Sequence, residues 1–340
     1  MAADPQVWIL SRGRKGDLDQ MLVLAKALGW PFEVKTLSFA GPEIPVLSQF
    51  LLRNMPSPPW PGLVLCAEAS PSVIAREIKR RSGWHTKIVC LGRPAGSAVG
   101  FDLVITTAQY RIPSADNVVE LSMPLSDETS ATAGERPQGP IAVIIGGPAF
   151  PDILDAAAAE RLTADALAYA ARKDLFLSVQ TSPRTPPAAV AVLQRRILPP
   201  HVLGVFGKGE NRYRAVLEEA SEIVVTSDSV SMVSDALATG KPVSIYPLAQ
   251  AHTMKWRTGE WLYAHAVARQ SRLLSPARWL FDSGVIEVAP DRRKLFSRLA
   301  AERRLSWFGE PPAEADPHAA QRDLARAAQS LRQLMTKEKD

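Results

Sequence analysis

Long hydrophobic runs and cysteines are both scarce in this sequence. The apolar runs are short, well below the about 18 residues that a membrane-spanning helix needs. The first residues, MAADPQ, lack the basic and hydrophobic regions of a signal peptide. Cys66 and Cys90 end the apolar runs LVLC and IVC without metal or redox spacing, so we expect both to be small, buried strand residues. These absences predict a cytoplasmic protein.

Charge of one sign does not dominate either. The net charge is +5, and lysine and arginine are spread along the chain. This mild excess fits an anionic ligand or an anionic membrane surface, which leaves open a position peripheral to the inner membrane. No nucleic-acid motif occurs, and no basic stripe is interleaved with aromatics, so we expect no nucleic-acid partner.

Several catalytic signatures are missing as well. The sequence has no G-x-S-x-G and no P-loop pattern, which argues against an α/β-hydrolase and against a kinase of that type. None of the five histidines forms a metal-ligand pair, so no metal site is predicted. Asp17-Leu18-Asp19 spells the D-x-D of metal-dependent glycosyltransferases. In those enzymes, however, the motif belongs to a different fold from the one that the strand pattern of this chain predicts, and to a different loop.

Short apolar runs alternate with helical patterns in both halves of the chain. The runs lack polar alternation, as expected of parallel strands buried on both faces. With 340 residues, two domains are expected. We predict an α/β protein with two Rossmann-like, doubly wound parallel-sheet domains that face a central cleft. The expected boundaries are 1–126 for the N-terminal domain, 127–140 for a polar linker, 141–305 for the C-terminal domain and 306–340 for a charged helical tail.

The segment TSDSVSMVSDALATGKPVSIYPL (226–248) crowds hydroxyls and carboxylates between a strand and a helix. Val230, Val233 and Leu237 are spaced as the buried stripe of that helix. The polar residues at its start are Ser227, Asp228, Ser229, Ser231 and Asp235. Free backbone amides and the positive end of the helix dipole favour an anion there. A well-capped helix without any ligand is the alternative.

Other polar loops follow other predicted strands, where ligands of doubly wound sheets bind. Gly146 and Gly147 either let the backbone approach a ligand closely or form a plain tight turn. Arg184 either pairs with phosphate oxygens or lies on the surface. The segment LSQFLLRNMPSPPWPG (47–62) is either core with a proline-rich loop or an apolar lip for a lipid-linked acceptor.

The segment VVTSDSVSMVSDALATGKPVSIY resembles the family named after the mitochondrial fission ELM protein, whose members are regarded as glycosyltransferases of the GT-B fold. It is similar, more loosely, to the peptidoglycan glycosyltransferase that makes lipid II. The pattern Ser-Glu-x-x-x-x-Gly-x-Pro of that enzyme reads Ser234, Asp235, Gly240 and Pro242 here. The likeness to the ELM family continues in VWILSRGRKGDLDQ, FDLVITT, IIGGP, TSPRTP, GENRY and LFDSGVIE.

The resemblance implies a glycosyltransferase whose C-terminal domain holds a nucleotide-diphosphate sugar, with a UDP-sugar expected first and no further cofactor. Asp235 would hold the ribose, and Ser227, Ser229 and the helix N-terminus would hold the diphosphate. Further residues near the nucleotide would be Gly146, Gly147, Arg184, Glu210, Asn211, Asp228 and Ser231. Lys255 and Arg257 could neutralise the leaving diphosphate. The acceptor would be a cell-envelope glycolipid such as a lipopolysaccharide intermediate.

An inverting transferase also needs a general base near the acceptor hydroxyl. The loop SRGRKGDLDQ offers Asp17, where relatives often carry histidine, and Glu68 is a second candidate. Two other functions remain open. A nucleotide-sugar epimerase of the same fold would work without an acceptor, and a non-catalytic adaptor would retain the fold without needing a base.

Overall fold

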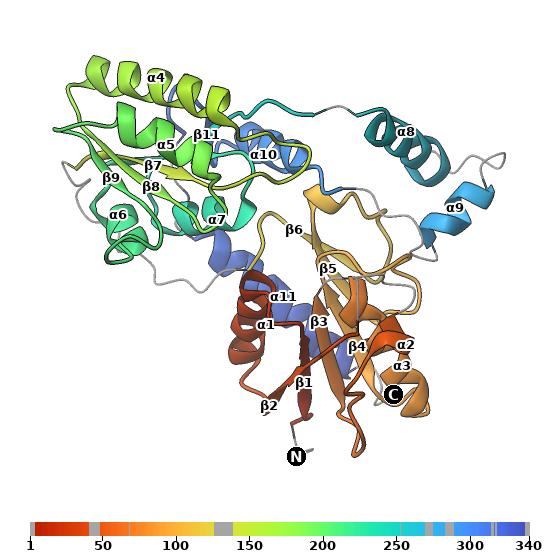
Figure 1. Ribbon diagram of the computed structural model, residues 1–340. Coiled ribbons are helices and arrows are strands. Elements are labelled where there is room, and N and C mark those ends of the chain that lie inside the picture. Colours follow the sequence, from red (N-terminus) through yellow and green to blue (C-terminus); the bar gives the residue numbers. More distant parts are fainter. Residues whose placement is uncertain are drawn as a thin grey trace. The chain divides into compact units, whose positions relative to one another are not determined.

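The structure, a computed structural model, describes residues 4–40, 48–67, 69–125, 139–251, 253–268, 275–282, 289–313, 316 and 318–336 (Figure 1). The chain divides into two compact units. Unit 1 comprises Met1–Asp127, Thr253–Pro290 and Ala320–Asp340, and unit 2 comprises Glu128–His252 and Asp291–Ala319. Each unit contains one six-stranded parallel sheet.

The sheet of unit 1 has the strand order β2-β1-β3-β4-β5-β6. Its strands are β1 (Val7–Ser11), β2 (Phe32–Thr36), β3 (Leu63–Ala67), β4 (Lys87–Leu91), β5 (Leu103–Thr107) and β6 (Val118–Leu121). The helices of this unit are α1 (Lys15–Leu28), α2 (Ser48–Leu51), α3 (Ala69–Arg81), η2 (Ala108–Tyr110), α8 (Met254–Tyr263), η3 (Ala264–Ala268), α9 (Ser275–Asp282) and α11 (Ala319–Thr336). From β1 the chain runs outward to β2 and then returns to β3 on the other side of β1, so the switch point lies between β1 and β3.

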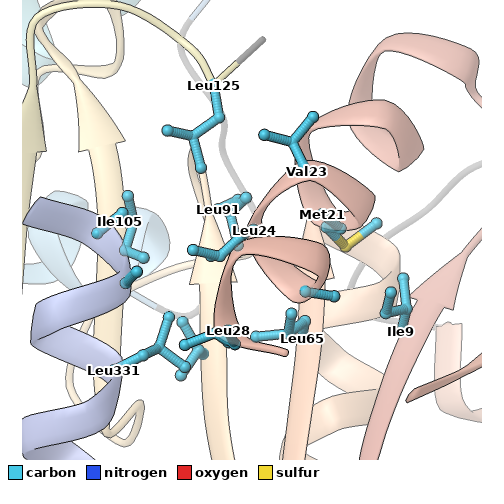
Figure 2. Close-up of a cluster of buried hydrophobic side chains, with 14 of the residues drawn as sticks. Ile9, Met21, Val23, Leu24, Leu28, Leu65, Leu91, Ile105, Leu125 and Leu331 are labelled. Atoms are coloured by element: carbon cyan, nitrogen blue, oxygen red, sulfur yellow. The ribbon is translucent and has the colours of Figure 1, made fainter. Parts of the chain in front are cut away.

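The strands of unit 1 are apolar throughout because helices cover both faces of the sheet. On one face, strand residues such as Ile9 and Leu65 form one buried cluster with Leu24 of α1 and Leu331 of α11, which Figure 2 draws. On the other face, the strands pack against Ile74 and other residues of α3. Cys66 and Cys90 are free and fully buried in this second layer, which confirms the expectation from the sequence.

The last helix of the chain belongs to unit 1. Asp323 of α11 is buried and accepts hydrogen bonds from the backbone amides of Ser122 and Met123, both at 3.1 Å. Ala327, Ala328 and Leu331 enter the hydrophobic cluster drawn in Figure 2. The C-terminal part of the chain therefore completes the core of the first sheet.

The segment Thr253–Pro290 also belongs to unit 1, and Arg111 holds it there. The Arg111 guanidinium donates to both carboxylate oxygens of Glu260, at 2.5 and 2.9 Å, and to the carbonyl of Ala289 at 3.2 Å. The Tyr263 hydroxyl donates to the carbonyl of Arg111. Contacts from α8 and from the far end of the segment thus converge on one residue after β5.

The sheet of unit 2 has the strand order β12-β11-β10-β7-β8-β9. Its strands are β7 (Ile141–Ile145), β8 (Leu177–Thr181), β9 (Val202–Gly204), β10 (Glu222–Thr226), β11 (Val243–Tyr246) and β12 (Ser306–Trp307). Its helices are α4 (Ala156–Lys173), α5 (Pro187–Arg196), α6 (Tyr213–Glu219), α7 (Val230–Ala238) and α10 (Arg292–Ala301). The chain proceeds from β7 to β8 and β9, then returns to β10 beside β7, so the switch point lies between β7 and β10.

The two doubly wound parallel sheets confirm the predicted GT-B fold class. The units differ from the expected boundaries in three places. Residues 253–290, expected in the C-terminal domain, and residues 320–336, expected as a tail, both belong to unit 1. Residues 306–319, also expected in the tail, belong to unit 2, where Ser306–Trp307 form β12. An apolar helical stripe shows that a helix is buried, but not which sheet it covers. Residues 127–138 of the expected linker lie outside the described residues. Among the described helices, none is long and apolar enough to cross a membrane.

Candidate functional site

The switch point of unit 2 brings together two of the segments that the sequence analysis singled out. Strands β7 and β10 pair in parallel, with Ile144 beside Val225, so their carboxyl ends are neighbours. Gly146 and Gly147 follow β7, and Ser227 to Ser229 lead from β10 into α7. In open α/β sheets, ligands bind at this position.

Gly146 and Gly147 join the ends of these two strands. The Gly146 amide donates to Oγ1 of Thr226 at 2.9 Å, and the Gly147 amide donates to Oδ2 of Asp228 at 2.8 Å. A Cβ atom on Gly146 would lie 1.9 Å from Oδ2 of Asp228, and one on Gly147 would lie 2.3 Å from the carbonyl oxygen of Arg184. Protein atoms therefore occupy the space that the missing side chains leave, and both amides are used inside the protein.

Asp228 lies at the centre of this arrangement. Its side chain is fully buried, and Oδ1 has no hydrogen-bond partner among the described residues. The nearest cation is Arg184, whose guanidinium nitrogen is 3.8 Å from Oδ2. Burial raises the pKa of the Asp228 carboxyl, while Thr226, the Gly147 amide and Arg184 act in the opposite direction. Asp228 therefore lies beneath the surface and links the ends of β7 and β10.

The loop after β8 packs against the same glycine. The hydroxyls of Ser182 and Thr185 both donate to the carbonyl of Gly146, at 2.9 and 2.6 Å. Thr181 accepts a hydrogen bond from the amide of Phe206 at 2.9 Å. These hydroxyls hold loops together, whereas the Arg184 side chain is half exposed and presents its charge at this edge.

Helix α7 begins without a side-chain cap. Its N-cap residue Ser229 is buried and makes no capping hydrogen bond, although its hydroxyl lies 3.3 Å from that of the exposed Ser231. The first amides of a helix have no intrahelical acceptor and carry the positive end of the dipole. With Arg184 close to Asp228, which precedes the cap, this helix start combines two sources of positive potential.

Ser227 has a structural role that the sequence did not indicate. Its buried hydroxyl accepts a hydrogen bond from the amide of Leu248 at 3.0 Å and lies 3.5 Å from Oδ1 of Asp152. Asp152 is paired with Arg292 of α10, with nitrogen–oxygen distances of 2.7 and 3.0 Å. Neither Asp152 nor Arg292 was predicted from the sequence, since the two lie 140 residues apart and nothing local links them.

Asp235 and Tyr213 form a second pair at this edge. The Tyr213 hydroxyl donates to Oδ2 of Asp235 at 3.0 Å, and Asp235 is exposed on the second turn of α7. Burial and the charge of Asp235 raise the pKa of Tyr213, so its hydroxyl stays protonated. Glu210 and Asn211 are exposed in the preceding loop, where Oδ1 of Asn211 accepts a hydrogen bond from the Tyr213 amide at 3.2 Å. The GENRY segment therefore adjoins α7.

The candidate bases belong to unit 1. Asp17 is half-buried in the first turn of α1, directly after β1, and Glu68 lies outside the described residues. Loops after β1 and β3 meet at the switch point, where Arg12 donates to the Ser70 hydroxyl at 3.3 Å. Asp17 thus occupies the ligand-binding edge of its own sheet.

The segment 47–62 and Arg257, both considered for the site from the sequence, belong to unit 1. In the segment 47–62, Leu52, Met55 and Trp60 pack against the core of unit 1, while Phe50 is 76% exposed. These three residues therefore belong to the hydrophobic core, as the first of the two interpretations of this segment expected. Arg257, considered for the leaving diphosphate, lies exposed on α8 of unit 1, and nothing is described of the Lys255 side chain.

The chain matches the family described as Mitochondrial fission ELM1 over residues 15–279, and it belongs to this family. No curated protein shows a significant match to the sequence.

Among solved structures, the chain is similar to MurG of Acinetobacter baumannii at 13% identity, with 95% of this chain and 99% of that chain covered and a TM-score of 0.43. It is also similar to MnaA of S. aureus in a co-structure with UDP, at 12% identity, 96% and 97% coverage and a TM-score of 0.46. For Arabidopsis thaliana UGT89C1 complexed with UDP-L-rhamnose, the identity is 10%, the coverage 97% and 100%, and the TM-score 0.47.

Proposed function

We propose that this protein is a glycosyltransferase that moves a sugar from a nucleotide-diphosphate donor to an acceptor hydroxyl. A UDP-sugar is the donor that we propose to test first. The observation that carries the proposal is the uncapped start of α7 at the switch point of unit 2, with the Arg184 side chain at the same edge. Membership of the ELM1 family, which the sequence resemblance associates with glycosyl transfer, supports the same class.

The donor diphosphate would lie at the start of α7. The free amides, the helix dipole, the Ser229 and Ser231 hydroxyls and Arg184 would stabilise the charge that develops on the departing diphosphate. Ser227 and Asp228 would support this site from below, because their side chains are buried and already bonded within the protein. We therefore propose that the hydroxyls of Ser229 and Ser231, rather than that of Ser227, contact the diphosphate.

The ribose would bind to Asp235. Its exposed carboxylate can accept two hydroxyl hydrogens, and the hydrogen bond from Tyr213 orients it. The acceptor would bind at the carboxyl edge of the unit 1 sheet, with Asp17 as the general base that takes the hydroxyl proton during an inverting displacement. A cell-envelope glycolipid is the acceptor class that we propose.

Thermal unfolding with UDP, GDP, ADP, CMP and dTDP, each with and without magnesium, tests the donor site. Binding to the folded state alone at 100 times Kd raises stability by about 2.7 kcal/mol. We expect one nucleotide to shift the Tm, and we expect Asp235→Asn to remove the shift. Asp165→Asn is the matched control and should leave the shift in place. Asp165 likewise accepts a hydrogen bond from a tyrosine, Tyr246, but it lies on α4 and not on α7.

The other two functions give different results in the same experiments. If no nucleotide shifts the Tm, the proposal is wrong and the non-catalytic adaptor is favoured. If the bound nucleotide sugar is converted without any acceptor, the epimerase is favoured. For the transferase, Asp17→Asn should abolish transfer while leaving the nucleotide-dependent shift in place.

A further inference from the structure

Helices α8 and α9 of unit 1 expose large apolar side chains to solvent. Met254 is 74% exposed, Trp261 53% and Trp279 64%. Isolated apolar side chains on a protein surface are ordinary, but several in one short segment indicate a surface that contacts another phase or molecule. Two of the three are tryptophans, which carry an indole N–H beside a large apolar ring.

The packing of the two helices turns these side chains outward. Met254, Arg257 and Trp261 share one face of α8 because they are spaced by three and four residues. The ring of Tyr263 lies on the opposite side of α8, where the guanidinium groups of Arg111 and Arg93 stack on it at 4.9 and 5.4 Å.

On α9, Phe281 packs against the ring of Tyr263, with 5.6 Å between ring centroids. Trp279 precedes Phe281 by two residues and is therefore about 200° away around the helix. Both tryptophans thus point away from the cluster formed by Tyr263, Ala266 and Phe281, which holds the helices together.

The charge of this segment is positive. Between Thr253 and Asp282 the sequence contains five basic residues, Lys255, Arg257, Arg269, Arg272 and Arg278, and two acidic residues, Glu260 and Asp282. Glu260 is neutralised by the paired Arg111. Arg257 and Arg278 are exposed on the same two helices as these apolar side chains.

We infer that the exposed side chains Met254, Arg257, Trp261, Arg278 and Trp279, here named the α8–α9 surface, dock onto an anionic lipid bilayer. Tryptophan rings prefer the boundary between headgroups and acyl chains, and arginine side chains reach from that boundary to the phosphates. Excess positive charge provides complementarity to anionic lipid. This inference goes beyond the proposed sugar transfer and does not depend on it.

Co-sedimentation of the full chain with vesicles tests the inference. Vesicles of phosphatidylcholine with phosphatidylglycerol should bind the protein, and vesicles of phosphatidylcholine alone should bind it far less. The double variant Trp261→Ser/Trp279→Ser should weaken binding to the anionic vesicles by about tenfold or more, because two anchors are lost. Arg257→Gln should weaken binding most at low salt.

Trp84→Asn is the matched control, because Trp84 is 65% exposed in unit 1 but lies in the turn after α3. It should leave vesicle binding unchanged, and unaltered Tm values should show that all variants fold. Equal binding to both kinds of vesicle, no binding, or an equal loss in Trp84→Asn would overturn the inference. So would self-association of the wild-type chain that disappears in the double variant, since the surface would then contact a second copy.

Discussion

The amide of Gly147 donates a 2.8 Å hydrogen bond to Oδ2 of Asp228, and this bond joins the ends of β7 and β10. The carboxylate that accepts it is fully buried and lies directly against Gly146. Because the two strands flank the switch point, this contact sets the shape of the edge where α7 begins. The stability of unit 2 and the candidate donor site thus depend on the same few atoms.

Gly146→Ala should destabilise the protein. The new Cβ would lie 1.9 Å from Oδ2 of Asp228, so the carboxylate or the backbone must move. Overpacking of this kind costs about 1–3 kcal/mol, and urea unfolding would measure it. Gly259→Ala is the control, because a Cβ there, within α8, meets no atom within 4 Å. The control should stabilise the helix by up to about 1 kcal/mol, and an equal loss in both variants would contradict the steric explanation.

Asp228→Asn should change how stability depends on pH. Burial raises the pKa of Asp228 above its ordinary value of 3.8, so the folded protein holds this proton more tightly than the unfolded chain. The contribution of Asp228 is therefore fully present below the unfolded pKa and is lost as pH rises through the folded pKa. The unfolding free energy of the wild type, relative to the asparagine variant, should fall by at most about 1.4 kcal/mol per pH unit in that window.

Denaturant unfolding of both proteins between about pH 4 and pH 8 would measure this difference. A relative stability that rises with pH would mean that Arg184 and the Gly147 amide outweigh burial and hold the pKa below its ordinary value.

Tyr213→Phe should weaken nucleotide binding while costing little stability. The variant removes only the hydroxyl that donates to Asp235 at 3.0 Å, which costs about 0.5–1.5 kcal/mol as a single hydrogen bond. Tyr246→Phe is the matched control, since its hydroxyl donates to Asp165 at 2.7 Å away from α7. Calorimetric titration with the nucleotide that shifts the Tm should show weaker binding in Tyr213→Phe alone. Equal affinities in the two variants would remove Tyr213 from the site.

Arg292→Met should destabilise unit 2 by about 3–5 kcal/mol, because it leaves the Asp152 carboxylate buried without its cation. The side chains are 10% and 1% exposed, so solvent screens this pair weakly. Adding Asp152→Asn to Arg292→Met should recover part of the loss, since the uncompensated charge is removed. A double-mutant cycle in urea measures the coupling, and strict additivity would contradict it.

Much of the fold follows from local patterns. Apolar runs such as VWILS and LVLCA predicted buried parallel strands, and their alternation with helices predicted two doubly wound sheets. The position of α7 after β10 also followed from the stripe of Val230, Val233 and Leu237. These features depend on the period of the side chains along one segment, which a sequence displays directly.

The roles within the candidate site did not follow in the same way. Ser227 and Ser229 have the same side chain and lie two residues apart, yet one hydroxyl is bonded to Leu248 inside the protein and the other lies at the helix start. Asp17 and Glu68 remain hypotheses for the base. The direction of each side chain depends on what the neighbouring strands place beside it.

The sequence by itself determined the fold class, the strand-to-helix transition at 226–230 and the family, because these depend on spacing and residue type over short stretches. Only the tertiary structure decided that residues 253–290 and α11 complete unit 1, and that Asp152 pairs with Arg292 and Tyr213 with Asp235. Those pairings join positions 140 and 22 residues apart. Whether such distant groups meet depends on how helices pack onto the sheets, and no local pattern encodes that choice.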